Sequence, residues 1–405
     1  MIFIVMSTDM PITDTIPRLN QLVPHMRDQL IALRHGLTFE ESRLRYAATV
    51  DQLVSKGLGR RTLSRAGDKD AYWSPTQEVL QEAMRLKFVE QGQLPSARRY
   101  LDQHRYRTHQ LTELGQEVAN LAESDPRAFY QKLSLAVIQS HPYFLSLLRS
   151  LESGPLLCPE ITEREVEEAR KKQMGTNHWV EFAEERINTG PLGPVSITEL
   201  IREDIVKAVR RRFGKKTIER PTSKALSEAL NDAFAAGALR SRGLTFGAID
   251  LRMLKTWGSQ LRLLDQSRYV QNYDHSNLIW IAADIGDDIN NLTISARGLS
   301  SHGSKVAAAV VDAYQSRALA SDSTLAAPYV PIYIVRAEAA YKCGVTRALT
   351  DLVIEKIVAG EFPDLGIRMW LHLGRGDQSP ASEPVYNRGG GRRYDMTLNT
   401  RRVEE

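Results

Sequence analysis

Few residues in this sequence have the types and spacing that covalent or metal chemistry requires. The nine histidines never form an HExxH pair, and His104 with His109 lacks a third metal ligand nearby. No GxSxG motif occurs. Asp284, Asp287 and Asp288 could bind a cation, but they equally suit a polar turn that caps a helix. We therefore expect a protein that is not an enzyme and that carries no metal or cofactor.

Arginines and lysines carry the clearest chemical signal, which is the binding of phosphates. Residues 40–56 predict a helix with one apolar side. Arg45, Thr49, Gln52 and Lys56 recur on another side, at spacings of four, three and four residues, and we call this set the polar strip. Because the polar strip contains no carboxylate, it could lie in a DNA major groove and read base edges.

A hairpin is expected directly after this helix. Residues 60–63 and 71–73 would form its two strands, with turn chemistry between them. Ser74 and Pro75 would then begin the next helix, as cap and first-turn residue. The basic residues on or near the hairpin, which would meet phosphates, are Arg60, Arg61, Arg65 and Lys69.

This stretch resembles a known family. The pattern Leu-x-x-Lys-Gly-Leu-x-Arg at 53–60, followed by Tyr-x-Ser-Pro-Thr at 72–76, resembles the recognition helix and wing of winged helix-turn-helix proteins, such as MarR-like regulators. The resemblance covers about residues 20–80 of a much longer chain. It implies that the polar strip faces DNA and that the wing arginines meet phosphates. A structural winged helix that contacts only protein is the other interpretation.

Two more segments are strongly basic. Residues 94–119 predict a basic helix packed on the first unit, because there is no room for a hairpin between Arg105 and Leu111. Its arginines would extend a phosphate track or face solvent; they are Arg98, Arg99, Arg105 and Arg107. Residues 203–216 hold the densest basic run, which is either a DNA contact or a solvated face. Within this run, Lys207, Arg210 and Arg211 have helical spacing.

Residues 331–398 predict another helix–helix–hairpin unit. Helices are expected over 331–342 and 346–358, and strands over 366–373 and 393–398. The second helix has Arg347, Asp351 and Glu355 on its polar side, and two carboxylates would repel phosphates. We therefore expect this unit to bind protein, or to reach DNA only through arginines of its loop and tail: Arg375, Arg388, Arg392, Arg393, Arg401 and Arg402.

Length and composition fit a cytoplasmic globular protein. The chain has 405 residues, 42% of them apolar and 25% charged, and a formal net charge of +4. At about 150 residues per domain this predicts two or three domains. Cys158 and Cys343 are isolated in the sequence and are expected to be buried thiols. No apolar run approaches the ~18 residues of a membrane span, and none has the flanks of a signal peptide.

The predicted fold is mainly α with short β-hairpin wings, arranged as two or three winged-helix-like units on a helical scaffold. The helix–helix–hairpin order could recur along the chain. The expected divisions are an N-terminal winged-helix and helical domain at 12–151, a connector at 152–196, a middle helical domain with a basic helix at 197–283, a linker plus helix at 284–328, and a C-terminal winged-helix-like domain with a basic tail at 329–405.

The function predicted from these features is non-catalytic binding of double-stranded DNA, within a larger complex that contains a protein partner or further copies of the chain. The whole chain loosely resembles multi-winged-helix subunits of prokaryotic DNA-defence (anti-phage or anti-plasmid) or chromosome-maintenance systems, which would place it in the cytoplasm, at the nucleoid. A transcriptional regulator is one alternative. A protein-binding scaffold for an ATPase or nuclease is the other.

Overall fold

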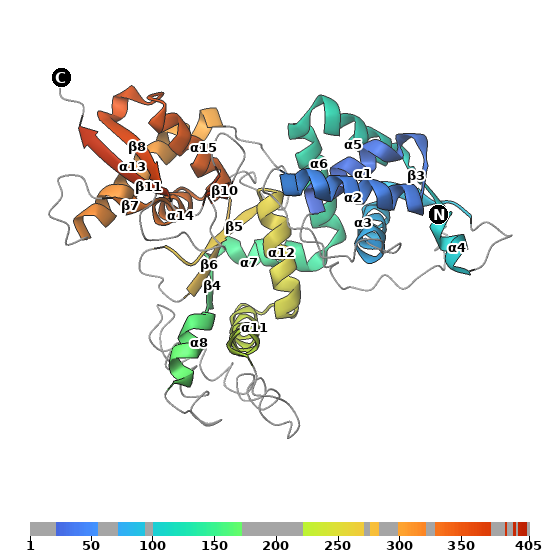
Figure 1. Ribbon diagram of the computed structural model, residues 1–405, viewed down its shortest axis with the longest axis horizontal. Helices are drawn as coiled ribbons and strands as arrows, with labels where there is room; N and C mark the ends of the chain where they lie inside the picture. The colour runs from blue at the N-terminus through green and yellow to red at the C-terminus, as the bar shows by residue number, and fades with distance from the viewer. Residues whose placement is uncertain are drawn as a thin grey trace.

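The computed structural model describes residues 22–55, 72–93, 100–171, 222–270, 276–282, 299–320, 329–373, 385–386, 392–393 and 396–402. Within these ranges the chain is mainly helical with small antiparallel sheets, which confirms the predicted fold class at this level (Figure 1). None of the helices described is long and apolar enough to cross a bilayer. The basic run at 203–216, the aspartates at 284–288 and residues 60–71 of the expected hairpin lie outside the described residues.

The first unit is a group of helices around a three-stranded sheet. In chain order its elements are α1 (Leu22–Ala32), η1 (Leu33–His35), β1 (Leu37–Thr38), α2 (Phe39–Ser55), α3 (Trp73–Arg85), β2 (Val89–Gln91), α4 (Tyr100–Arg105), β3 (Thr108–Leu111) and α5 (Glu113–Ser124). Strand β3 lies between β1 and β2 and is antiparallel to both. Thr112 caps α5 by accepting the Gly115 N–H. Position 115 requires glycine, because a Cβ there would lie 1.8 Å from the Phe88 carbonyl oxygen.

The hairpin of the first unit differs from the predicted one. Trp73 lies in α3 rather than in a strand, because its ring packs on Phe39 with centroids 4.3 Å apart. Strands β2 and β3 form the hairpin instead. As expected, no hairpin lies between Arg105 and Leu111, because β3 pairs with residues that precede α4. The single basic helix expected over 94–119 was wrong, because its described part consists of α4, β3 and the start of α5. Burial of Val89 and half-burial of Leu111 hold this pairing against the core.

The middle unit repeats this type of sheet. Its elements are α6 (Pro126–Ser140), α7 (Pro142–Glu152), β4 (Leu156–Pro159), α8 (Glu163–Arg170), α11 (Ser223–Ser241), α12 (Ala248–Gln260), β5 (Leu264–Ser267) and β6 (Ser276–Ile281). Strand β6 lies between β4 and β5. β4 falls within residues 152–196, the expected connector, and pairs with β6. Cys158 on β4 is free and buried, as predicted, and burial raises the pKa of its thiol to about 11.

The C-terminal unit follows the predicted helix–helix–strand order. Its elements are α13 (Leu299–Ala320), β7 (Val330–Pro331), α14 (Ile332–Cys343), α15 (Arg347–Val358), η2 (Pro363–Leu365), β8 (Ile367–Leu373), β9 (Val385–Tyr386), β10 (Arg392–Arg393) and β11 (Met396–Arg402). Gly344 makes the turn with φ of 64°, and Thr346 caps α15, both as predicted. Cys343, at the end of α14, is free and buried, also as predicted.

The partner of β8 lies further along the chain than the predicted 393–398. Strand β11 pairs with all seven residues of β8, placing Leu398 opposite Leu371. Arg392 and Arg393 form β10, which pairs with β9 within the connection between β8 and β11. The predicted start of the partner strand was wrong because β8 pairs with β11 along all seven of its residues. This pairing begins only at Met396, after the two arginines.

One topology therefore occurs three times. In each unit a first strand is followed by helices and then by two more strands, and the last strand lies between the other two. The helix immediately before the second strand is α3 in the first unit, α12 in the middle unit and α15 in the C-terminal unit. Figure 1 shows the middle unit between the other two.

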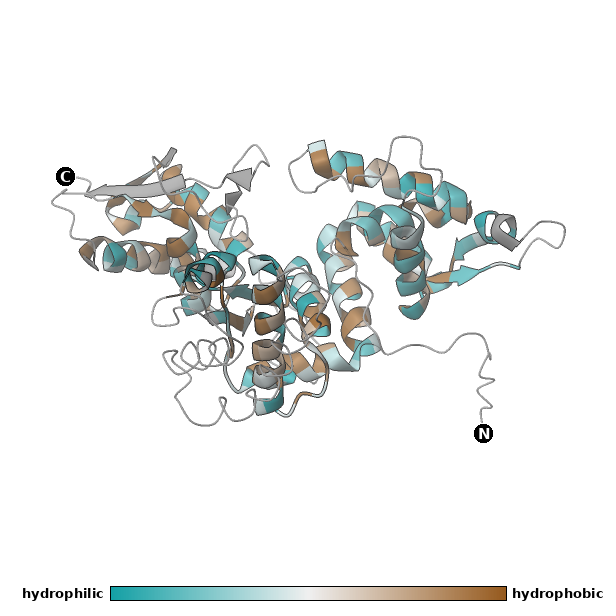
Figure 2. Cartoon of the chain, turned by 60° about the horizontal axis from the view of Figure 1, so that its bottom comes forward, coloured by the Kyte–Doolittle hydropathy of each residue, from teal (hydrophilic) through white to brown (hydrophobic). Residues whose placement is uncertain are grey.

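Two hydrophobic cores meet at the middle sheet. Ile279 on β6 belongs to the core that the first and middle units share. Its neighbours Leu278 and Trp280 point to the other side, into the core of the C-terminal unit. This alternation is the period of two expected for a strand buried on both faces. Figure 2 shows hydrophobic residues as stripes along the helices, as this packing requires.

Candidate nucleic-acid interface

The structure describes only part of the predicted DNA-binding set. The side chains of Arg45, Thr49 and Gln52 are described, and Arg392 and Arg393 are described as backbone in β10. The other predicted contacts lie outside the described residues: Lys56, Arg60, Arg61, Arg65, Lys69, Lys207, Arg210, Arg211 and Arg388.

Helix α2 carries the polar strip, but the strip is not a continuous exposed face. Arg45 and Gln52 are exposed, whereas Thr49 is buried. The Thr49 hydroxyl lies 2.9 Å from Asp28 Oδ2 and 3.1 Å from the Arg45 carbonyl oxygen. The prediction that Thr49 reads bases was therefore wrong, because its side chain joins α2 to α1.

The stack of His25 on Tyr46 strengthens the contact between α1 and α2. The two rings lie 3.8 Å apart and within 7° of parallel. Burial lowers the pKa of His25 to about 4 and raises the pKa of Tyr46 to about 12, so both rings are neutral at physiological pH. Helix α2 is thus a supporting helix on the side that faces α1.

Helix α3 has an exposed face that is polar and uncharged. Its exposed residues are Ser74, Gln77 and Gln81, at spacings of three and four residues. Neither glutamine side chain makes a hydrogen bond within the described part of the chain. On the opposite side, buried Glu82 contacts His141, with Oε1 and Nε2 2.6 Å apart. Helix α3 is therefore fixed on its inner side while its outer amides remain available.

The exposed side of α3 and the β2–β3 hairpin enclose a groove with a cavity of about 350 Å³. Its apolar lining comes from Phe39, Trp73, Leu80 and Met84. Its polar lining comes from Gln77, Gln81, Gln91, His104, Arg107 and His109. The groove thus combines ring surfaces, amides and a cation from α2, α3, α4 and the β2–β3 hairpin, with Arg107 between α4 and β3.

The charges around the groove are unevenly partnered. Arg105 Nε lies 3.6 Å from Glu40 Oε2, and its guanidinium lies 5.8 Å from the Trp73 ring centroid. The hydrogen bond from Arg43 lowers the pKa of Glu40 below its ordinary value. Arg107, by contrast, has a buried Nε that meets no acceptor among the described residues. Burial lowers the pKa of His109 to about 4, so Arg107 supplies the positive charge of the groove's lining at neutral pH.

The equivalent helices of the other two units differ from α3. On α12 the exposed residues are Ile249 and Arg252, and Arg252 pairs with Asp232 at 3.3 Å. On α15 the exposed residues are Ala348 and Leu352, both apolar. Among these three helices, α3 alone exposes only hydrogen-bonding side chains in the described chain.

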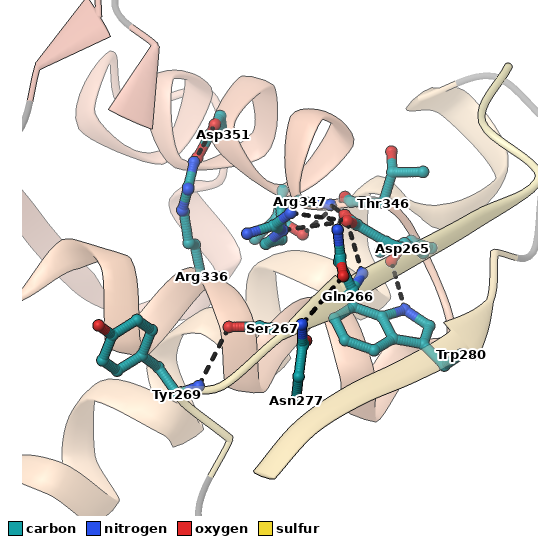
Figure 3. Close-up of polar contacts among 12 residues, drawn as sticks. Asp265, Gln266, Ser267, Tyr269, Asn277, Trp280, Arg336, Thr346, Arg347 and Asp351 are labelled. Carbon is teal, nitrogen blue, oxygen red and sulfur yellow. Dashed lines mark hydrogen bonds and ion pairs between the residues drawn. The ribbon is translucent and has the colours of Figure 1, made fainter. Parts of the chain in front are cut away.

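The N-terminus of α15 is fixed to the middle sheet. Figure 3 shows Arg347 directed at Asp265 on β5, which accepts hydrogen bonds at 2.5 Å from the Arg347 backbone N–H and at 2.9 Å from Nη2. The Trp280 indole N–H donates to the Val345 carbonyl oxygen at 3.0 Å. These bonds occupy the end of α15 that would otherwise be free to meet a phosphate.

The acidic strip predicted on α15 is not an exposed surface. Asp351 is buried and pairs with Arg336 on α14, with Nη1 and Oδ2 2.8 Å apart (Figure 3). Leu352, the next residue along the helix, is 48% exposed. The prediction of an exposed acidic strip was wrong because the Asp351 carboxylate faces inward and neutralises buried Arg336. Leu352, one position further along the helix, therefore faces outward.

Neither a metal site nor a similarity to known proteins indicates what kind of protein this is. Within the described ranges no three histidine, cysteine or acidic side chains gather as a metal site would require. No protein-family model, curated protein or solved structure matches the chain.

Sequence reasoning missed the glutamines of α3 and the place of Arg107. Two features of the sequence could have indicated them. Gln77 and Gln81 are four residues apart, which places them on one face of a helix. Leu111-Thr112 followed by Gly115 resembles the end of a wing.

Proposed function

We propose that this protein is a non-catalytic duplex-DNA-binding subunit, in which α3 of the first unit enters the major groove. The observation that carries the proposal is the exposed face of α3, formed by the uncharged residues Ser74, Gln77 and Gln81, which have no hydrogen-bond partner among the residues that the structure describes. Glutamine amides hydrogen-bond to base edges in the major groove, and adenine is their usual partner.

The topology supports a winged-helix arrangement for each unit. Helices that precede a hairpin, with the last strand between the other two, are the arrangement we expect of a winged helix. In such a unit the helix before the hairpin is the groove-reading helix, and the hairpin is the wing. The proposal therefore assigns these roles to α3 and to β2–β3, in place of α2 and residues 60–73.

The segments next to these elements in sequence support phosphate binding. Residues 56–71, between α2 and α3, contain five basic and two acidic side chains: Lys56, Arg60, Arg61, Arg65, Lys69, Asp68 and Asp70. Arg98 and Arg99 lie between β2 and α4. Arg45 on α2 is exposed and adds a further cation. Such cations supply the sequence-independent part of DNA affinity.

A second role, contact with a protein partner, is favoured by the C-terminal unit. Leu352 on α15 is 48% exposed and Trp370 on β8 is 39% exposed. Exposed large apolar side chains are enriched where proteins bind one another. In this proposal the first unit binds DNA and the C-terminal unit joins a larger assembly, either in DNA defence or in chromosome maintenance. A transcriptional regulator would use the same α3 surface.

The test is fluorescence anisotropy of the full chain with a labelled random-sequence duplex. We expect binding that weakens as salt rises from about 50 to 200 mM. The double variant Gln77→Ala/Gln81→Ala should lose about tenfold or more in affinity for a preferred site. The matched control is Asn120→Ala on α5, an exposed amide outside the groove. Wild-type protein that binds no duplex at low salt, or a double variant that binds as tightly as the control, would contradict the proposal.

A further inference from the structure

The groove beside α3 has the size of a ligand site rather than of a packing defect. Its cavity measures about 350 Å³ and lies between α3, α4 and the β2–β3 hairpin. Small-molecule sites begin at about 300 Å³ and combine an apolar lining with a few fixed polar groups. The groove meets both conditions.

Aromatic residues form one wall of the cavity. Phe39 and Trp73 both line it, and their rings pack against each other with centroids 4.3 Å apart. Leu80 and Met84 extend this wall along α3. The two rings are tilted by 48°, so each offers its own face to the cavity lining. Such aromatic surface suits a planar ring, because every base can stack on an aromatic side chain.

Amides line the cavity beside these apolar side chains. Gln77 and Gln81 have no hydrogen-bond partner in the described chain, and Gln91 uses its amide nitrogen at 3.4 Å from His109 Nε2. Each glutamine offers a donor and an acceptor side by side. Three such groups fit a ring whose edge alternates donors and acceptors, whereas a simple aromatic acid would leave them unpaired.

Arg107 adds a cation at the same cavity. Its Nε is buried without an acceptor among the described residues, and no described carboxylate forms an ion pair with it. Guanidinium groups bind phosphate through paired N–H donors. Without a carboxylate partner among the described residues, this guanidinium completes a set of recognition groups for a ring, a polar edge and an anion.

We infer that this cavity binds a nucleobase together with its phosphate. The inference rests in part on the proposed DNA binding, because an unpaired base in bound DNA is one source of this ligand. A free nucleotide is the other source, and it presents the same ring, edge and phosphate.

The experiment compares two labelled duplexes that differ only by a single-nucleotide bulge, each titrated with the full chain. A second arm titrates the four deoxynucleoside 5′-monophosphates by calorimetry. Met84→Trp fills the cavity, and Arg107→Gln removes its charge while keeping most of its length. Lys87→Gln is the control, because Lys87 is an exposed cation just after α3 that does not line the cavity. Circular dichroism melts check that each variant folds.

We expect the bulged duplex to bind about fivefold or more tighter than the paired one, as stacking of one base allows. This ratio should fall to about one in Met84→Trp and Arg107→Gln and persist in Lys87→Gln. Monophosphate binding that both cavity variants abolish would support the free-nucleotide source. The inference is overturned if neither a bulge preference nor monophosphate binding occurs, or if both survive Met84→Trp and Arg107→Gln. Failure to bind either duplex would instead contradict the proposed function, while the calorimetric arm still tests the cavity.

Discussion

Helix α3 and helix α15 occupy the same place in two copies of one topology, yet they face different surroundings. α3 is anchored on its inner side, through Glu82 and His141, and exposes amides. α15 is anchored on its inner side through Asp351 and at its N-terminus through Arg347, and it exposes Leu352. A repeated topology therefore does not imply a repeated function, because function depends on which side chains remain unpartnered.

The largest expected effect comes from breaking the inner anchor of α15. Asp351→Ala would remove the carboxylate that pairs with Arg336 inside the protein, where the two side chains are 5% and 3% exposed. Loss of one partner of a buried pair costs about 3–5 kcal/mol in the free energy of unfolding. Chemical denaturation measures this, with Glu355→Ala on the same helix as a control that changes stability by less than about 0.5 kcal/mol. Equal stabilities of the two variants would show that α15 is not held in this way.

The next largest effect is the pH dependence of stability that arises from His109, which lines the groove. Burial lowers the pKa of His109 from 6.5 to about 4. Between these values the unfolded chain binds a proton that the folded chain does not, so stability is complete above pH 6.5 and falls with decreasing pH. The slope is about 1.4 kcal/mol per pH unit for each such histidine. Burial also lowers the pKa of His25 to about 4. His109→Gln should therefore reduce the slope of unfolding free energy against pH between these two pKa values, but should not abolish it. An unchanged slope would mean that His109 is accessible to protons.

A smaller effect separates the supporting helix α2 from α3. Thr49→Val keeps the shape of the side chain but removes the hydrogen bond to Asp28. We expect a loss of about 1–2 kcal/mol in unfolding free energy and no change in DNA sequence preference. Gln52→Ala, an exposed neighbour on α2, is the control for stability. A shift in sequence preference in Thr49→Val would restore α2 as the base-reading helix.

The smallest expected effect is on salt dependence. Arg60→Ala/Arg61→Ala should reduce the slope of log K against log salt by about 0.9 for each phosphate that the variant no longer neutralises. Arg127→Ala, an exposed arginine on α6, is the control and should leave the slope unchanged. If the double variant and the control share one slope, the segment between α2 and α3 does not contact phosphates.

Local features of the sequence predicted the C-terminal unit best. Gly344 and Thr346 mark the turn and the cap between two helices, and alternation marks β8. Leu226, Leu230 and Phe234 recur at helical spacing along α11, and all three are buried. Such features depend on residues close together in the chain, which is why one sequence suffices to find them.

Long-range pairing explains what the sequence did not reveal. β2 and β3 pair across α4, and β4 pairs with β6 across most of the middle unit. The burial of Thr49 and Asp351 likewise depends on partners in other helices, Asp28 and Arg336. A polar residue on a helix has the same periodicity whether it faces water or a buried partner, so spacing alone could not separate the two.

The most direct test of the central claim places the same charge on both helices. Gln77→Glu and Leu352→Glu each introduce a carboxylate at an exposed position, on α3 and on α15. Anisotropy titrations with one labelled duplex at low salt compare the two variants with the wild-type chain. We expect Gln77→Glu to weaken binding by about tenfold or more, because the amide no longer bonds to a base and the carboxylate repels phosphates, and Leu352→Glu to leave it unchanged. Equal losses in both variants, or a loss in Leu352→Glu alone, would contradict the assignment of DNA binding to α3.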